Sequence, residues 1–378
     1  MRRAVSAALA GTVLLSATAA SASTVPAWVE APPVPVPPGA TETVLRDVSI
    51  VSTTDVWGVG AWLGREPHTL AAHWDGGRWT TVPTPEATGK DHTYGLNAVD
   101  AVASDDVWAV GETAAVADSA DVVPLLLHYD GTAWTEQPGP LGVDGTLTDL
   151  DLVTAEDGWA VGNRAAGPLI LRWTAGQWTS ATVPALGPGA SLVSVSTTSS
   201  DDAWAVGTQR RNGRQAALVL HWNGALWSEV PVPDAYPADQ PLTGVAATSS
   251  ADVWAVGSQC AGSLLNLCHP TVLHYTSGTW QVVPAALDAT ITAVVSFAPD
   301  DVWIFGQATS SMTALDHIEH WDGTRFTPQA AIPRGTINNH PASALSLAAA
   351  DGDRATQALW AVGWVQDGSR STHAIFRH

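Results

Sequence analysis

The side chains best suited to chemistry in this sequence lie in segments whose length varies from one to the next. They are histidines, aspartates and two tryptophans: His68, His92, His269, His340, Asp91, Asp239, Asp316, Trp62 and Trp364. Imidazole and carboxylate groups can exchange protons or hold a metal ion only where several of them converge on one point. An indole ring can stack on a sugar or clamp a protein partner. We take Trp62, Trp364, His92 and His340 as the candidate ligand-binding residues.

The spacing of these residues matches none of the common catalytic or metal-binding motifs. The sequence contains no His-Glu-x-x-His, no His-x-His, no calcium-loop pattern, no Gly-x-Ser-x-Gly and no phosphate-binding loop. We therefore expect no metal and no cofactor, and a binding protein in place of an enzyme. A hydrolase or lyase acting on glycans is the alternative, and it would require carboxylates and histidines from several parts of the chain to converge.

A repeated heptapeptide must position these residues. Residues 105–111 read Asp-Asp-Val-Trp-Ala-Val-Gly, and the tryptophan of this motif recurs at Trp57, Trp108, Trp159, Trp204, Trp254, Trp303 and Trp360. The spacing between copies runs from 45 to 57 residues. A period near 50 is typical of propeller blades and too long for the common helical repeats. The seven copies therefore predict a seven-bladed β-propeller.

One repeat contains the sequence pattern of four strands. Residues 147–153 alternate polar and apolar side chains, and residues 158–162, 169–173 and 177–179 supply three further strands, separated by short turns. The turn before the last strand reads Asp-Gly or Asn-Gly in other repeats, which is a strong hairpin signal. We expect blades of four antiparallel strands, A to D in chain order. The D–A and B–C connections would then emerge on one loop-rich face.

Aromatic residues recur at fixed places in the repeat. The third strand ends in Trp74, Tyr129, Trp173, Trp222, Tyr275 and Trp321, and the fourth begins at Trp79, Trp134, Trp178, Trp227, Trp280 and Phe326. Sheets that stack face to face need large flat side chains between them, so we expect these rings to join the blades. Histidines precede the third-strand aromatic at His73, His128, His221, His274 and His320. We expect them to be structural and to bond an adjacent backbone group.

The two ends of the chain complement each other. Residues 374–378 match the third strand of a blade, and the chain stops there without a fourth. Residues 24–30 resemble a fourth strand and precede the first blade. We therefore predict an all-β, seven-bladed propeller of four-stranded antiparallel blades, in which the N-terminal strand completes the last blade. Such pairing removes the open edges of the sheet array.

The N-terminus has the features of an export signal. Residues 1–3 read Met-Arg-Arg, an apolar run follows to Ala19, and Ala20-Ser21-Ala22 is a small-residue cleavage pattern. We expect a signal peptide over residues 1–22, a propeller over residues 23–378, and a secreted, extracellular, monomeric product with no membrane span. In that oxidising setting Cys260 and Cys268 are expected to form a disulfide. Two metal-binding thiolates are the alternative, which the spacing disfavours.

The charge of the chain narrows the class of partner. Sixteen Lys and Arg stand against 36 Asp and Glu, for a net charge of −20. Nucleic-acid binding proteins usually carry a basic patch, and the densest basic cluster here is Arg210, Arg211 and Arg214. We expect no nucleic acid as partner. Carbohydrate or another extracellular macromolecule, such as a protein, is the expected ligand of the loop-rich face.

The repeat resembles that of secreted bacterial seven-bladed propellers built on Asp-Asp-Val-Trp-Ala-Val-Gly motifs, and more distantly that of kelch-type propellers such as the central domain of galactose oxidase. The resemblance covers essentially the whole mature chain and implies the fold, not an activity. Kelch repeats carry a Gly-Gly pair, whereas Val110-Gly111 supplies one glycine. The copper chemistry of galactose oxidase is not expected, because Tyr129 and Tyr275 stand at framework positions of the repeat.

Overall fold

The structure of the chain is a computed structural model. It describes residues 28–85, 92–115, 118–233, 241–260, 268–308, 315–329, 336–337, 340–341, 344–367 and 370–378. The predicted signal peptide and its cleavage site lie outside the described residues. Every regular element of the described part is a β-strand. No helix in that part is long and apolar enough to cross a membrane.

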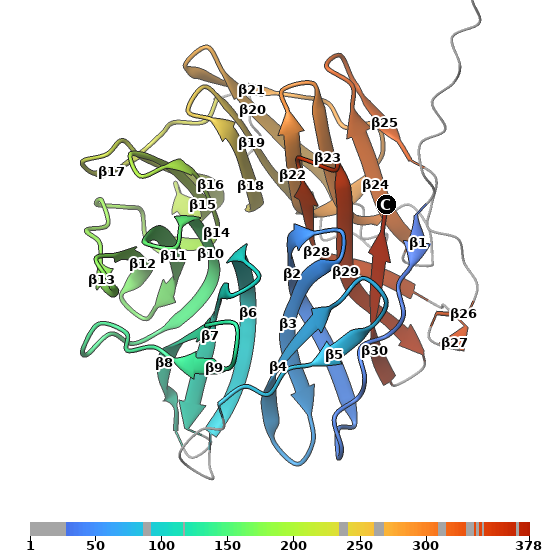
Figure 1. Cartoon of the computed structure of the whole chain (residues 1–378). Helices are drawn as coiled ribbons and strands as arrows, with labels where there is room; N and C mark the ends of the chain where they lie inside the picture. The colour runs from blue at the N-terminus through green and yellow to red at the C-terminus, as the bar shows by residue number, and fades with distance from the viewer. Residues whose placement is uncertain are drawn as a thin grey trace, which may run out of the picture.

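The strands form seven blades arranged in a ring (Figure 1). In blade 3 the strands are β10 (Thr146–Thr154), β11 (Asp157–Arg164), β12 (Gly167–Thr174) and β13 (Gln177–Ser180), paired antiparallel in chain order. The first strand of each blade contacts the first strands of both neighbouring blades, so these strands make the inner wall. The predicted seven-bladed β-propeller is confirmed.

The other blades repeat this order of strands. Blade 1 contains β2 (Glu42–Ser52), β3 (Asp55–Leu63), β4 (Pro67–Trp74) and β5 (Trp79–Thr81). Blade 2 contains β6 (His92–Ala103), β7 (Asp106–Ala115), β8 (Asp118–Tyr129) and β9 (Trp134–Glu136). Blade 4 contains β14 (Ser191–Ser199), β15 (Asp202–Arg211), β16 (Arg214–Trp222) and β17 (Trp227–Glu229).

The last three blades follow the same plan. Blade 5 contains β18 (Leu242–Ser249), β19 (Asp252–Cys260), β20 (Cys268–Thr276) and β21 (Thr279–Val282). Blade 6 contains β22 (Ala289–Ala298), β23 (Asp301–Ala308), β24 (Leu315–Trp321) and β25 (Phe326–Pro328). Blade 7 contains β28 (Ala344–Asp353), β29 (Ala358–Asp367) and β30 (Arg370–Arg377), and a small hairpin of β26 (Thr336–Ile337) and β27 (His340–Pro341) precedes it.

The N-terminal strand supplies the fourth strand of blade 7, as predicted. β1 (Val29–Glu30) pairs antiparallel with β30, with Val29 opposite Arg377. Trp28, directly before β1, is buried and packs its ring against Phe305 of blade 6 at 5.8 Å and against His378 at 5.2 Å. Trp28 therefore takes the place of the fourth-strand aromatic, and the ring closes through the two ends of the chain (Figure 1).

The hydrophobic core of the described residues divides into seven clusters, each shared by two adjacent blades. In blade 1 the motif tryptophan Trp57 is 1% exposed and contacts Tyr129 and Trp134 of blade 2, with ring centroids 4.7 and 5.4 Å apart. Trp360 of blade 7 contacts Trp74 and Trp79 of blade 1 in the same way. The prediction that aromatic rings join the blades is confirmed.

The motif glycine is required by a close approach between the first two strands. A β-bulge interrupts the pairing of β6 with β7 between Leu96 and Ala98, opposite Gly111. A Cβ on Gly111 would lie 1.9 Å from the carbonyl oxygen of Gly95. The same bulge and the same conflict recur in blades 1, 3, 4, 5 and 6. Glycine ends the motif because the backbone of the inner strand occupies the space of a side chain.

The recurring histidines bond a carboxylate, so the backbone partner expected from the sequence is wrong. His128 Nε2 lies 2.8 Å from Oδ1 of Asp106, the motif aspartate two residues before Trp108, and its ring packs on that tryptophan at 4.4 Å. The same pairs form in blades 1, 4, 5 and 6. Blade 3 substitutes Arg172 and Asp157. Histidine and aspartate therefore orient the motif tryptophan.

Candidate functional site

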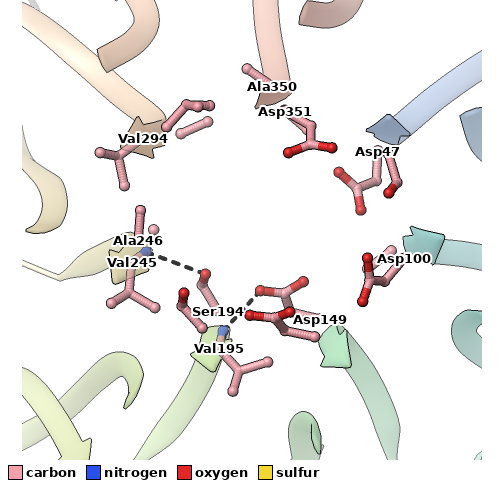
Figure 2. A pocket seen from close by; sticks show the side chains of 18 of the residues that line it. Asp47, Asp100, Asp149, Ser194, Val195, Val245, Ala246, Val294, Ala350 and Asp351 are labelled. Atoms are coloured by element: carbon pink, nitrogen blue, oxygen red, sulfur yellow. Dashed lines mark hydrogen bonds between the residues drawn. The ribbon is translucent and has the colours of Figure 1, made fainter. Parts of the chain in front are cut away.

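The seven inner strands enclose a central channel with a volume of about 430 Å³ (Figure 2). Side chains alternate along a strand, so every second residue of an inner strand faces the channel. Two rings of side chains arise in this way. The first holds Asp47, Ala98, Asp149, Ser194, Gly244, Ala293 and Ala349, and the second holds Ser49, Asp100, Asp151, Ser196, Ala246, Val295 and Asp351.

Five carboxylates of these rings gather in one half of the channel. They are Asp47, Asp100, Asp149, Asp151 and Asp351, which we call the channel aspartates. They come from blades 7, 1, 2 and 3, which are neighbours in the ring, and they face a wall of small residues such as Ala246 and Ala293 from the opposite blades (Figure 2). The channel is therefore acidic on one side and neutral on the other.

Each channel aspartate accepts a hydrogen bond from the backbone of the next blade. The acceptor and donor pairs are Asp47 with Val99 at 2.9 Å, Asp100 with Leu152 at 2.7 Å, Asp149 with Val195 at 2.8 Å, Asp151 with Thr197 at 2.6 Å and Asp351 with Ile50 at 2.8 Å. Serine hydroxyls do the same from blade 4, where Ser196 Oγ accepts from Ala247 N at 3.1 Å. These bonds join neighbouring inner strands, which are not paired as sheet strands.

Confinement in the channel raises the pKa of these carboxyl groups. Loss of water is the main cause, and it raises the pKa of Asp149 and of Asp351 to about 7 and that of Asp100 to about 6. The pKa values of Asp47 and Asp151 are raised well above the usual range, through burial and through the charge of neighbouring aspartates. Backbone hydrogen bonds oppose these shifts in every case.

The positive side chains that line the channel do not neutralise it. Arg46 donates from Nη1 to Oδ1 of Asn97 at 2.6 Å, and Arg354 donates from Nη2 to the carbonyl oxygen of Ala247 at 3.3 Å. Both guanidinium groups therefore contact neutral oxygen atoms. Across the described residues no three His, Cys, Asp or Glu side chains are placed to hold one metal ion. The channel therefore offers a cluster of carboxyl groups whose pKa values are raised by burial.

Trp62 packs on its own hairpin. It lies at the outer end of β3, and its ring stacks on His68 with centroids 4.0 Å apart and planes at 14°. The backbone of Trp364 lies in β29, opposite His373, and its side chain is outside the described residues. Trp62 of β3 pairs with Thr43 of β2, and Thr43 in turn pairs with Thr372 of β30 in blade 7. The two tryptophans thus belong to adjacent blades, with backbones roughly 14 Å apart across three strand spacings.

The two candidate histidines are placed by their backbones alone. His92 begins β6 and pairs with Ala115, and His340 lies in β27 opposite Ile337. Their side chains, like residues 91 and 239, fall outside what the structure describes. Besides His68, His269 is the loop histidine whose side chain is described, and its Nδ1 lies 2.9 Å from Oδ1 of Asp288. No described contact joins Trp62, Trp364, His92 and His340, so the predicted binding set stays a prediction.

The sequence reasoning missed the channel aspartates, although a signal was present. Asp149, Leu150 and Asp151 alternate in a strand expected to be the first of its blade. Polar residues at every second position of a first strand point to the axis, since the other face must pack on the next blade. The same alternation places Asp47 with Ser49 and Asp100 two residues after Ala98.

The two faces of the ring differ in their connections. Six of the seven A–B turns contain two residues, whereas the B–C connections contain two residues in four blades and three, six and seven in the other three. The B–C hairpin of blade 5 carries Cys260 and Cys268 directly opposite each other, joined by a disulfide. The face with the B–C hairpins is therefore the variable one, and the A–B and C–D turns make a regular face.

Comparison with known proteins shows the fold. No protein-family model matches the chain, and no curated protein matches its sequence. A solved structure described as YCF48 bound to D1 peptide is similar, with 14% identity, a TM-score of 0.58, and coverage of 94% of this chain and 97% of that one. YCF48 from Cyanidioschyzon merolae matches with 13% identity, a TM-score of 0.55 and coverage of 93% and 99%. At these identities the likeness establishes that the chain is a β-propeller.

Proposed function

We propose that this chain is a secreted, non-catalytic binding propeller whose variable face recognises a segment of another extracellular protein. The observation that carries the proposal is the contrast between the two faces, because the turns of one contain two or four residues and the B–C hairpins of the other range from two to seven. Binding surfaces are commonly built from variable connections on a rigid scaffold. Secretion follows from the export signal expected at residues 1–22.

The rigidity of the scaffold supports this role. Aromatic clusters join each pair of blades, and the channel aspartates tie inner strands that no sheet pairing connects. A preorganised surface loses little conformational entropy when it binds. A propeller of similar fold has been solved bound to a peptide, which is a precedent for an extended protein segment as the ligand of such a scaffold.

Carbohydrate is the alternative ligand of the same face. The partly exposed ring of Trp62, held by its stack on His68, offers a flat apolar surface at the edge of blade 1. Indole rings of this kind can stack on sugars. Binding to peptides and binding to sugars are therefore tested separately in one experiment.

The test is a binding screen of the mature chain, residues 23–378, on a peptide array and a glycan array. We expect saturable binding to peptides that survives a chelator and is lost when B–C hairpins other than those of Trp62 and Trp364 are altered. The double variant Trp62→Ala/Trp364→Ala separates the arms, since it should abolish binding to sugar and leave peptide binding intact. Arg78→Gln on the regular face is the control. Absence of binding to the peptide array would contradict the proposal, and binding to the glycan array alone would favour the carbohydrate alternative.

A glycan hydrolase or lyase is the second candidate, and the channel aspartates favour it. A carboxyl group with a pKa of about 7, such as Asp149, stays partly protonated at neutral pH and can protonate a leaving group. The carboxylates of four blades converge as an acid–base site requires. Against it, each of them already bonds the backbone of the next blade. Release of reducing ends from a glycan panel, lost in Asp149→Asn, would establish the enzyme instead.

A further inference from the structure

We infer that the tip of the β15–β16 hairpin binds an acidic segment of the protein partner, through Arg210 and Arg214. The inference rests on the proposed function, because it assigns a chemistry to the partner of the variable face. We call residues 210–214, which read Arg-Arg-Asn-Gly-Arg, the arginine hairpin.

The turn at the tip holds the arginines in a defined geometry. Asn212 and Gly213 have φ values of 52° and 78°, the two positive values of a type I′ turn. Such a turn matches the twist of the strands, so the pairing continues to its end, with Arg211 opposite Arg214 and Arg210 opposite Gln215. All three arginine side chains are exposed. The hairpin is a rigid projection with three guanidinium groups at its end.

The base of the hairpin is fixed to the body of the protein. The backbone N–H of Arg210 donates to the carbonyl oxygen of Pro188 at 3.0 Å. The buried side chain of Gln209 accepts a hydrogen bond from the N–H of Gly187 at 2.9 Å. The connection that enters blade 4 therefore braces the hairpin from one side. A fixed base reduces the entropy that a binding partner must remove.

The arrangement of charge is unfavourable without a partner. Like charges directly opposite each other in an antiparallel pair destabilise it, and Arg211 lies directly opposite Arg214. An ion pair with Glu229 offsets the charge of Arg211 alone. Neither Arg210 nor Arg214 forms an ion pair with an acidic side chain among the described residues. A carboxylate of a binding partner would pair with the guanidinium group of Arg210 or Arg214 and compensate its charge.

One carboxylate already shows how the hairpin binds this group. Glu229 Oε1, from the end of β17, accepts hydrogen bonds from Arg211 Nη2 and from Gln209 Nε2. The contact engages one arginine and leaves the guanidinium groups of Arg210 and Arg214 facing solvent. An acidic segment could repeat on these two residues the charged hydrogen bond that Arg211 Nη2 donates to Glu229, since hydrogen bonds between guanidinium and carboxylate groups are among the strong ones.

The rest of the surface would direct an acidic segment to this point. The chain carries a net charge of −20, and three of its 16 basic residues fall within these five positions. The regular face instead exposes carboxylates in its C–D turns, at Asp75, Asp130 and Asp322. A short acidic peptide is repelled elsewhere and attracted here, whereas a long polyanion such as nucleic acid would meet more repulsion than attraction.

Fluorescence anisotropy with short labelled peptides tests the inference. The mature chain is titrated into hexaglutamate, hexalysine and a neutral Gly-Ser hexapeptide at low and at high ionic strength. We expect saturable binding of hexaglutamate that weakens with salt, because exposed charges are screened. In Arg210→Gln/Arg214→Gln the dissociation constant should rise about tenfold. Arg211 is left in place because it holds Glu229.

The matched control is Arg78→Gln/Arg325→Gln, which removes two exposed arginines from C–D turns of the regular face. This variant should bind hexaglutamate as the unaltered chain does, and the melting curves of both variants should confirm that they fold. Equal binding by the hairpin variant, or equal affinity for the neutral peptide, would overturn the inference.

The experiments distinguish failure of this inference from failure of the proposed function. If the peptide array yields ligands without acidic residues, and the hairpin variant still binds them, the binding function stands and the acidic partner is wrong. If sulfated glycans bind the hairpin and hexaglutamate does not, a protein carboxylate is not the ligand. If no peptide binds in either experiment, both the inference and the proposed function fail.

Discussion

Oδ2 of Asp149 accepts a hydrogen bond from the backbone N–H of Val195 at 2.8 Å, and the two residues belong to adjacent blades. The inner strands of a propeller diverge from one another and cannot pair as a sheet, so polar side chains must connect them. Blades 7, 1, 2 and 3 use carboxylates for this purpose, and blade 4 uses serine hydroxyls. The carboxylate half of the wall carries a charge that depends on pH.

The first prediction is that the protein loses stability as the pH rises from about 5 to about 8. Burial raises the pKa of Asp149 and of Asp351 to about 7, against about 3.9 in an unfolded chain. The folded chain therefore holds protons that the unfolded chain releases. The stability that they add is complete below about pH 4 and is lost as the pH passes through 7. We expect the melting temperature to fall by about 4 °C or more over this range.

The variant Asp149→Asn is the control for this prediction. An amide keeps a carbonyl oxygen that can accept from Val195 N–H, and it carries no charge. The variant should therefore show a shallower dependence of melting temperature on pH and should equal or exceed the unaltered chain at pH 8. Asp75→Asn, in an exposed turn, should leave the dependence unchanged. Parallel melting profiles for all three proteins would contradict the assignment.

The fold could be predicted because one motif meets the same physical demand in every blade. Trp108 fills the gap between two sheets, and Gly111 admits the backbone of the inner strand, so both recur at fixed spacing. Repetition turns these local requirements into a visible period. The closure by Trp28 could be predicted for the same reason, since a blade that lacks its last strand must find one elsewhere.

The site was harder to predict because it depends on which face of a strand points to the axis. Asp149 and Asp151 are visible as an alternating pair, but the alternation places them in the channel only once their strand is known to be the innermost of its blade. The partner of His128 could have been found by comparing blades. In each of the six blades with a counterpart of Asp106, a histidine or arginine stands opposite the motif tryptophan, although blade 7 keeps Arg377 there while Ala358 replaces the aspartate. Contacts between loop tips leave no such trace in a single sequence.

The second prediction concerns Gly111. Its substitution by alanine should destabilise the protein by roughly 3 kcal/mol or more, because the new Cβ would lie 1.9 Å from the carbonyl oxygen of Gly95 and the bulged backbone must move. Urea denaturation of the two proteins measures the difference. Gly139→Ala is the matched control, since its Cβ would meet only Leu126 at an ordinary distance of 3.5 Å. Equal losses in the two variants would show that the bulged backbone accommodates the new Cβ without an additional cost, and would contradict the prediction.

The third prediction concerns the closure of the ring. Trp28→Ala removes a side chain that is 5% exposed and packs between blades 6 and 7, so we expect a loss of about 3–5 kcal/mol in the free energy of unfolding. Val36→Ala, at a side chain that is 59% exposed in the same N-terminal segment, should change stability little. If the melting curve of the Trp28 variant matches that of the control, the N-terminal strand is not needed to close the ring.

The fourth prediction uses the exception in blade 3. Arg172 takes the place of the histidine, bonding Asp157 from Nε at 3.1 Å and the carbonyl oxygen of Ser200 from Nη2 at 3.2 Å. Its guanidinium also lies over Trp159, 5.1 Å from the ring centroid. Arg172→Ala should cost about 2 kcal/mol, because it leaves a largely buried carboxylate without its charged partner.

Arg172→His should recover about half of that loss. The imidazole can restore the bond to Asp157 and the stack on Trp159, as His221 does with Asp202 and Trp204 in blade 4, but it cannot also reach Ser200. Chemical denaturation of the two variants beside the unaltered chain gives the order. If the histidine variant is no more stable than the alanine variant, an imidazole cannot replace the guanidinium as the partner of Asp157 in this blade.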